Sequence, residues 1–279
     1  MIRLLQIEFQ KIWKNRSSKI LSIAYFVILS FIALIASIKF NIGTFELHIA
    51  DQGIFNFPYI WHFNTYIAAI LKFFLAIVIV SMMANEYSYG TLKQNLIDGL
   101  SKKEFIQSKF LTVVVFALAS TVFVFFMSLL LGISFSSYNE IDIIFSDLEY
   151  IIAYFVKLVA FFSFCLFLGI LVKRSAFAIG FLFIWNIIEG IIIGVLRWKV
   201  FKGTDNYQHI TQFLPLESMS NLIKEPFTRL SVIKNIETTI GGEVAAKDYG
   251  VHWFSLFIVI CWIVIFMLMS YKIIQKRDL

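Results

Sequence analysis

Six long apolar runs, separated by polar segments, constrain the fold of this 279-residue chain more than any other feature. The runs cover residues 20–40, 65–84, 110–133, 150–172, 176–196 and 252–274. A bilayer core about 30 Å thick is crossed by a helix of roughly 20 apolar residues, and each run has about that length. Hydrophobic residues make up 59% of the chain, above the roughly 45–50% usual in soluble proteins. The sequence therefore predicts an all-α integral membrane protein, a single domain over 1–279 with six transmembrane helices.

Lysine and arginine residues gather in alternate polar segments. They occur in 1–19, 85–109, 173–174 and 272–277, whereas 41–64 and 134–149 contain none. Because positively charged segments are retained on the cytoplasmic side, we expect both termini in the cytoplasm (N-in, C-in) of a multi-pass protein of the cytoplasmic (inner) membrane. Segment 198–251 has balanced charge, and alternation alone predicts that it is an external loop.

The first 19 residues have the pattern of an amphipathic helix. The apolar stripe consists of Ile2, Leu5, Phe9, Ile12 and Trp13. Cationic and polar residues surround this stripe, so we expect the segment to lie in the interface plane, in contact with membrane lipid. The alternative is a simple extension of the first span into the cytoplasm.

Residues 85–109, with the sequence NEYSYGTLKQNLIDGLSKKEFIQSK, form a polar island between the second and third runs. Thr91 is a candidate N-cap for a short helix that has Leu92 and Leu96 on one face. Gly99 can end that helix, because glycine readily adopts the left-handed conformation found at helix C-termini.

A second helix is predicted to begin within the same island. Ser101 and Glu104 have the spacing of a capping box, and the helix that they start leads into the third span. A short helix with exposed leucines can dock into a groove of another protein. The alternative is an ordinary surface-packed connector.

Three charged residues lie well inside the predicted spans: Lys72, Lys157 and Glu189. A charge at the centre of a span costs about 2.5–3.5 kcal/mol, so such side chains normally face protein or water. All three lie about two helical turns from the external ends and could meet. Glu189 could pair with one lysine, leaving the other to reach outward or to contact an anionic group of a cargo. In the alternative, both lysines reach outward and Glu189 caps a helix contact.

Gly190 and Gly194 form a G-x-x-x-G step beside Glu189 on the fifth span. Small residues at this spacing allow two helices to approach closely. The pattern fits a contact within the chain as well as a contact between two copies.

The sequence also argues against several classes of function. The net charge of +6 comes from the basic residues of the alternate polar segments and not from a basic surface with interleaved aromatic residues. No nucleic-acid partner is therefore expected. The chain has no Gly-Lys of a P-loop, no His-Glu and no G-x-S-x-G, so we expect no catalytic, cofactor-binding or metal-binding residues and no enzyme activity. Cys165 and Cys261 lie in apolar runs and are expected to be free thiols. The four histidines are expected to be solvated or interfacial residues at the outer side.

The spans, the cytoplasmic ends, the amphipathic first helix and the polar island together resemble the permease subunit of a type-two ABC exporter. In that family an acidic residue and a Gly-Thr-Leu stretch follow the second span, and the next residues couple to the ATPase. The corresponding residues here are Glu86, Gly90, Thr91, Leu92, Lys93 and Leu96. The stretch FLPLESMSNLIKEPF resembles the family's external segment, in which short helices can dip back toward the membrane.

The resemblance implies an ABC transporter permease that exports an unidentified substrate, with a lipophilic or peptide-like molecule favoured. ATP and Mg²⁺ would be held by a separate ABC ATP-binding subunit, so this chain would carry no cofactor. A second permease copy, in a homodimer or heterodimer meeting through the first and fifth spans, would make Gly190 and Gly194 a dimer contact. The alternative function is a non-transporting membrane sensor or assembly protein that binds a cytoplasmic partner through 85–109.

Overall fold

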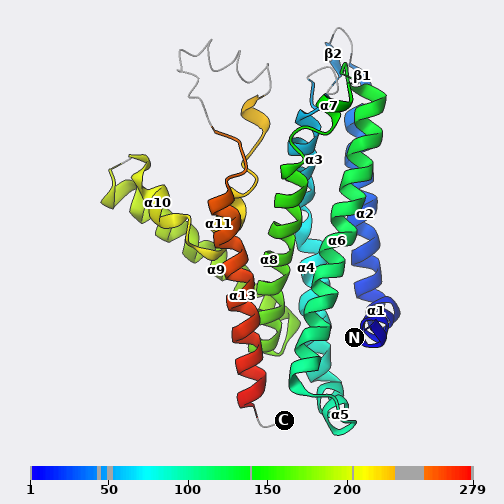
Figure 1. Ribbon diagram of the computed structural model, residues 1–279, viewed down its shortest axis with the longest axis vertical. Coiled ribbons are helices and arrows are strands. Elements are labelled where there is room, and N and C mark those ends of the chain that lie inside the picture. The colour runs from blue at the N-terminus through cyan, green and yellow to red at the C-terminus, as the bar shows by residue number, and fades with distance from the viewer. Residues whose placement is uncertain are drawn as a thin grey trace.

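Long helices dominate the structure, as the apolar runs predict. The computed structural model describes residues 2–42, 45–48, 53–138, 140–202, 204–229 and 248–277. Within these residues, five helical stretches are long and apolar enough to cross a membrane. They are formed by α2 (Arg16–Ser37), α6 (Lys102–Phe135), α8 (Glu149–Val172), α9 (Ser175–Val195) and α13 (Trp253–Lys276). These helices, drawn in Figure 1, indicate a multi-pass membrane protein.

The second predicted span, residues 65–84, is not one straight helix. Instead, α3 (Tyr59–Ile70) and α4 (Lys72–Ser88) meet at Leu71 with a bend of 45°. Residues 59–88 contain neither proline nor glycine, so the local sequence carries none of the usual signals of a kink. The bend lies where the side chain of Lys72 turns into a pocket between the helices.

Shorter elements connect the long helices. An antiparallel hairpin of β1 (Lys39–Ile42) and β2 (Phe45–His48) follows α2 and is a small exception to the predicted all-α class. The helix α7 (Ile141–Ile144) precedes α8, and a π-helical turn (Leu196–Val200) extends α9. The described part of 198–251 contains 3₁₀ turns at Asp205–Tyr207 and Phe227–Arg229 and the helices α10 (Gln208–Thr211) and α11 (Pro215–Asn221).

The helix α8 is the centre of the bundle, and α9 lies at its edge. In an 18-residue apolar segment of the stretch that includes α8, 78% of the residues are buried, whereas only 11% are buried in the corresponding segment of the stretch that includes α9. The helix α8 packs against α3, α4, α6, α9 and α13. Figure 1 shows α9 leaning away from this centre, with α10 at its far end. Most of α9 is therefore free to contact lipid or another protein.

Buried hydroxyl groups join the inner helices. The Tyr25 hydroxyl on α2 lies 2.6 Å from Ser120 Oγ on α6 and 2.7 Å from the Tyr154 hydroxyl on α8. Asn64 Nδ2 on α3 donates to Ser128 Oγ on α6 at 2.9 Å. Hydrogen bonds between helices inside a membrane each contribute roughly 0.6–2 kcal/mol, so these contacts set which helix faces meet.

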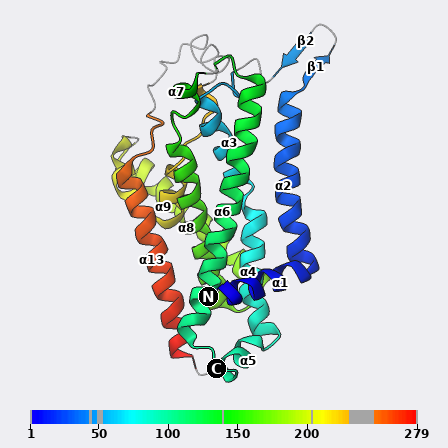
Figure 2. The ribbon, with the colours of Figure 1, turned by 45° about the vertical axis from the view of Figure 1, so that its right-hand side comes forward.

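The N-terminal helix α1 (Ile2–Lys14) is separate from α2. Asn15 lies between them and caps α2, because its side-chain oxygen accepts a hydrogen bond from Ser18 N–H at 3.0 Å. Figure 2 shows α1 lying crosswise to α2 at one end of the bundle. A simple extension of the first span is therefore wrong, since the chain changes direction at Asn15.

Both ends of the chain lie at the same end of the bundle as the polar island. Figure 2 shows α1 and the last turns of α13 at the end of the bundle that also holds α5 (Thr91–Ile97). Lys102 Nζ at the start of α6 donates to the Arg277 carbonyl at 2.9 Å. Arg277 Nη1 in turn donates to the Ile170 carbonyl at 2.6 Å, close to the basic pair after α8. The four basic segments of the sequence thus gather at one end.

The histidines were expected to be solvated or interfacial, and His62 is not solvated, because it is fully buried on α3. Arg229 Nη1 lies 3.1 Å from His62 Nδ1, and His62 Nε2 lies 2.9 Å from the Lys224 carbonyl. Because arginine can only donate, Nδ1 accepts and Nε2 donates. The sequence carries no sign of this burial, because residues far along the chain fold back onto α3.

Candidate functional site

The polar island folds into the short helix α5, held by a turn at Gly90. Gly90 has a φ of +68°, a left-handed backbone conformation that favours glycine, and is the N-cap residue of α5. The prediction of Thr91 as the cap is wrong, since Thr91 is the first helical residue. Its hydroxyl instead donates to Glu86 Oε2 and ties α5 to the last turn of α4.

The end of α5 and the start of α6 follow the predicted capping pattern. Gly99, with a φ of +96°, lies just beyond α5. Ser101 Oγ accepts from Glu104 N–H at 3.2 Å, and Ser101 N–H donates to Glu104 Oε2 at 3.0 Å, which completes the capping box. The island thus consists of α5, a short break, and the first turns of α6, which continues into the third apolar run.

The predicted leucine face of α5 points into the protein. Leu92 is only 1% exposed and belongs to the core, and Leu96 packs against it partly buried. The exposed residues of α5 include Lys93 and Ile97, and Ile97 is 79% exposed. A protein that binds at this end would therefore contact Lys93 and Ile97 and could not reach Leu92.

Four charged side chains behind α5 form a cluster, here called the ion cluster, that joins α1, α4 and α6. Lys109 Nζ on α6 lies 2.6 Å from Glu8 Oε2 on α1 and 2.6 Å from Glu86 Oε1 on α4. Lys11 Nζ lies 2.8 Å from Glu86 Oε1 and 3.4 Å from Glu8 Oε1. Glu8, Glu86 and Lys109 are buried, while Lys11 is partly exposed. Two carboxylates and two ammonium groups thus balance one another.

The ion cluster gives Glu86 a structural role inside the chain. Burial lowers the pKa of Lys11, but hydrogen bonds and charge from Glu86 and Glu8 outweigh burial and raise that pKa above its usual value. Lys11 therefore stays cationic at neutral pH. Removing one member of a buried ion pair costs about 3–5 kcal/mol, because the remaining charge is left buried and unpaired. The cluster thus holds three helices together directly beside α5.

The sequence pointed to Glu86 but not to its partners Glu8 and Lys109. Glu8 is the only acidic residue among the first 45, and this isolation in a basic helix is a signal that could have marked it. The position of Lys109 at the start of the third span indicated topology only. Its burial depends on α1, because Glu8 lies 101 residues away in sequence.

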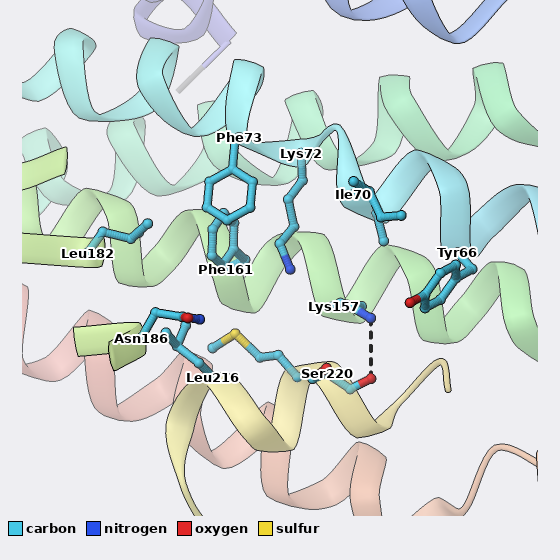
Figure 3. A pocket seen from close by; sticks show the side chains of 12 residues that line it. Tyr66, Ile70, Lys72, Phe73, Lys157, Phe161, Leu182, Asn186, Leu216 and Ser220 are labelled. Atoms are coloured by element: carbon cyan, nitrogen blue, oxygen red, sulfur yellow. Dashed lines mark hydrogen bonds between the residues drawn. The ribbon is translucent and has the colours of Figure 1, made fainter. Parts of the chain in front are cut away.

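Lys72 and Lys157 line a single pocket at the junction of α3 and α4. The pocket has a volume of about 250 Å³, and α8, α9 and α11 complete its walls. Figure 3 shows both lysine side chains pointing into it. Lys72 Nζ lies 4.3 Å from the centre of the Phe161 ring, and Lys157 Nζ donates to the Ser220 carbonyl at 3.4 Å. Within the described residues, neither lysine forms an ion pair with a carboxylate.

Glu189 does not pair with either lysine. Its carboxylate accepts hydrogen bonds from the N–H groups of Leu216, at 3.1 Å, and Glu217, at 2.9 Å, at the start of α11. Trp185 Nε1 donates to the same carboxylate at 2.6 Å. A carboxylate at a helix N-terminus is favourable because it satisfies free N–H groups and complements the helix dipole. Glu189 therefore caps a helix, as in the second predicted arrangement, whereas Lys72 and Lys157 both face the pocket.

Gly190 and Gly194 do not pack against another helix within the described residues. A Cβ atom added at either glycine would have no neighbour within 4 Å. The G-x-x-x-G step therefore makes no close approach to any other described segment, and its surface is open in the part of the chain that the structure describes.

Charged side chains gather at two places in the described structure, the ion cluster and the pocket. Among the described residues, no group of three or more His, Cys, Asp or Glu side chains could hold a metal ion. The described arrangement consists of a balanced ion cluster at one end and a cationic pocket farther along the bundle.

Comparison with known proteins identifies a family. A family model described as "Protein of unknown function (DUF2705)" matches residues 4–279. No curated protein matches the chain.

Proposed function

The chain belongs to the DUF2705 family, and we propose that it is the membrane-spanning permease subunit of an ATP-driven ABC exporter of type two. In this proposal it moves a lipophilic or peptide-like substrate across the cytoplasmic membrane. A separate ATP-binding subunit binds ATP and Mg²⁺ and supplies the energy. This chain converts the movement of that subunit into a movement of its own helices.

The proposed topology has six spans with both termini in the cytoplasm. The bent pair of α3 and α4 counts as one span beside the five long stretches. The gathering of the basic segments at one end of the bundle supports a cytoplasmic position for that end. The helix α1 is proposed to lie in the membrane interface, which is supported by two large apolar side chains that it leaves exposed, Ile2 at 75% and Trp13 at 57%.

The observation that carries the proposal is the ion cluster directly behind α5. The exposed residues of α5 offer a partner a contact surface, and Thr91 links α5 to Glu86. Glu86 is bonded to Lys109 on α6 and to Lys11 on α1. A force applied to α5 would therefore reach α4, α6 and α1 together, as coupling to an ATPase requires.

A second copy of the permease is proposed to bind along α9. The open surface at Gly190 and Gly194 and the low burial of α9 support this contact. Cysteine crosslinking at Gly194 between two copies provides a test, and the absence of a crosslink in an active complex would count against it.

Co-purification with an ABC ATP-binding subunit tests the proposed function. The double variant Lys93→Glu/Ile97→Glu should abolish co-purification and stimulated ATPase activity while the chain stays folded, because both side chains are exposed. The matched control is Ile141→Glu, which changes an isoleucine that is 72% exposed on α7. Unchanged coupling in the double variant would remove the assignment of α5. Partner binding without any transport would support the alternative of a sensor or assembly protein.

A further inference from the structure

Two lysines, Lys72 and Lys157, line the pocket between α4, α8 and α9, and neither forms an ion pair with a carboxylate of the described residues. Lys157 is 4% exposed, and its described hydrogen bond is the long one to the Ser220 carbonyl. Two acidic residues lie nearby, Glu189 and Glu217. The Glu189 carboxylate accepts hydrogen bonds from main-chain N–H groups at the start of α11. Glu217 Oε1 accepts a hydrogen bond from Asn221 Nδ2 at 3.2 Å. Neither carboxylate forms an ion pair with Lys72 or Lys157 in the described structure.

Such a pair of ammonium groups is costly without an anion. A lysine at the centre of a span costs about 2.5–3.5 kcal/mol on insertion scales. Two like charges that share a cavity also repel each other. One anionic group between Lys72 and Lys157 would offset both effects, and the amide of Asn186 in the pocket wall offers a further hydrogen bond.

The size and the mouth of the pocket limit what that anion can be attached to. Its volume of about 250 Å³ lies just below the ≈300–1,000 Å³ of typical small-molecule sites. This space suits a headgroup better than a whole large molecule. At the rim, Ile70 is 53% exposed and Phe73 is 37% exposed. The Phe73 ring stacks on Phe183 of α9 at 5.9 Å, and Phe183 is itself 53% exposed. The pocket therefore opens beside apolar surface.

We propose that this pocket binds the anionic headgroup of a membrane amphiphile, whose apolar chain lies outside against α4 and α9. The headgroup accepts hydrogen bonds from Lys72 and Lys157, and the chain contacts Ile70, Phe73 and Phe183. The substrate class is thus an amphiphile with a phosphate or carboxylate headgroup. Its role as cargo rests on the proposed export function, whereas its binding does not.

Direct binding to the purified full-length chain in detergent tests the inference, with native mass spectrometry as the readout. The probe is dioctanoyl phosphatidate, compared with zwitterionic dioctanoyl phosphatidylcholine and with inorganic phosphate, which has no apolar chain. We expect phosphatidate to bind at least about tenfold more tightly than either comparison, since hydrogen bonds to charged groups contribute about 1.5–3 kcal/mol. Lys72→Met and Lys157→Met should each weaken phosphatidate binding about tenfold or more.

Two further variants serve as a control and as an independent test of the pocket. Lys199→Met removes an exposed lysine near the far end of α9 and should leave phosphatidate binding unchanged. Asn186→Phe keeps both pocket lysines but fills the cavity and should block binding, so it carries the test if a lysine variant does not fold.

Several results would overturn the inference. They are the absence of phosphatidate binding, equal binding of phosphatidylcholine, or no effect of the pocket variants. Equal binding of inorganic phosphate would show a plain anion site and overturn the amphiphile assignment. Because no ATPase is present in this assay, its failure is distinct from a failure of the proposed export function, which co-purification tests.

Discussion

Two lysines of the described bundle, Lys109 and Lys157, are almost equally buried but have opposite surroundings. Lys109 is 0% exposed and Lys157 is 4% exposed. Lys109 Nζ contacts two carboxylates at 2.6 Å each. Lys157 Nζ instead contacts a main-chain carbonyl at 3.4 Å and faces a cavity. Equal burial therefore does not imply an equal role.

The difference separates a structural charge from a charge that awaits a ligand. In the ion cluster, excellent geometry and balanced charge offset much of the desolvation cost, so the contacts hold helices in place. In the pocket, no described carboxylate pairs with Lys157, and ionisable side chains that face a cavity inside a membrane commonly mark functional sites. Substitutions at the two sites should therefore have opposite effects on stability.

The largest expected effect is that of Lys109→Met. This change leaves Glu8 and Glu86 buried with Lys11 as their one cationic partner among the described residues, so the free energy of unfolding should fall by about 3–5 kcal/mol. Titration of the purified chain with sodium dodecyl sulfate in mixed micelles measures it. The exposed Lys93→Met is the control, with a change expected within about 0.5 kcal/mol. Equal stability of the two variants would show that Lys109 does not stabilise the fold through the ion cluster.

The next effect has the opposite sign. Lys157→Met removes a buried charge that has no carboxylate partner, so the free energy of unfolding should rise by about 1–3 kcal/mol in the same titration. Lys199→Met serves as the exposed control. A loss of stability comparable to that of Lys109→Met would mean that Lys157 is a structural charge too.

A third substitution tests whether the region around α5 and the pocket are energetically independent. Gly90→Ala forces a side chain into a left-handed conformation at the start of α5 and should cost about 1–2 kcal/mol. Gly180→Ala, in the helical interior of α9 with no atom within 4 Å of the added Cβ, should instead be neutral or stabilising. Phosphatidate affinity of the pocket should be the same in both variants. A changed affinity in Gly90→Ala would show that the two regions are not independent.

The smallest effect is expected at Lys11, whose side chain is 37% exposed. Solvent screens its ion pairs, so Lys11→Met should lower the free energy of unfolding by about 1 kcal/mol. Because the pKa of Lys11 is raised, its contribution is fully present below the unfolded-state pKa and is lost only as pH rises through the folded-state pKa, which lies above 10.5. The difference between wild type and variant should therefore be constant from about pH 6 to pH 9. A difference that changes within this range would contradict the assigned charge state.

Local patterns predicted the elements whose causes lie within a few residues. The apolar runs predicted the long helices, and the spacing of Ser101 and Glu104 predicted the start of α6. The bend at Leu71 and the burial of His62 were missed, because each depends on packing between distant segments. The sequence left open whether the leucine face of α5 is exposed for docking or packed as part of a connector, because the residues that bury Leu92 lie in other segments.

The sequence by itself determined the membrane-spanning class, the long apolar helices other than the bent second span, and the gathering of basic residues in alternate segments, since hydrophobic length and capping act over short distances. Only the tertiary structure decided which charges meet. Lys72, Lys109, Lys157 and Glu189 look alike in the sequence, each a charge in or beside an apolar run. Contacts made across 23 to 101 residues of chain give Lys109 two carboxylates, and Glu189 binds the start of α11. Lys72 and Lys157 are left facing a cavity, because the energy of a buried charge depends on its neighbours in space and not on its neighbours in sequence.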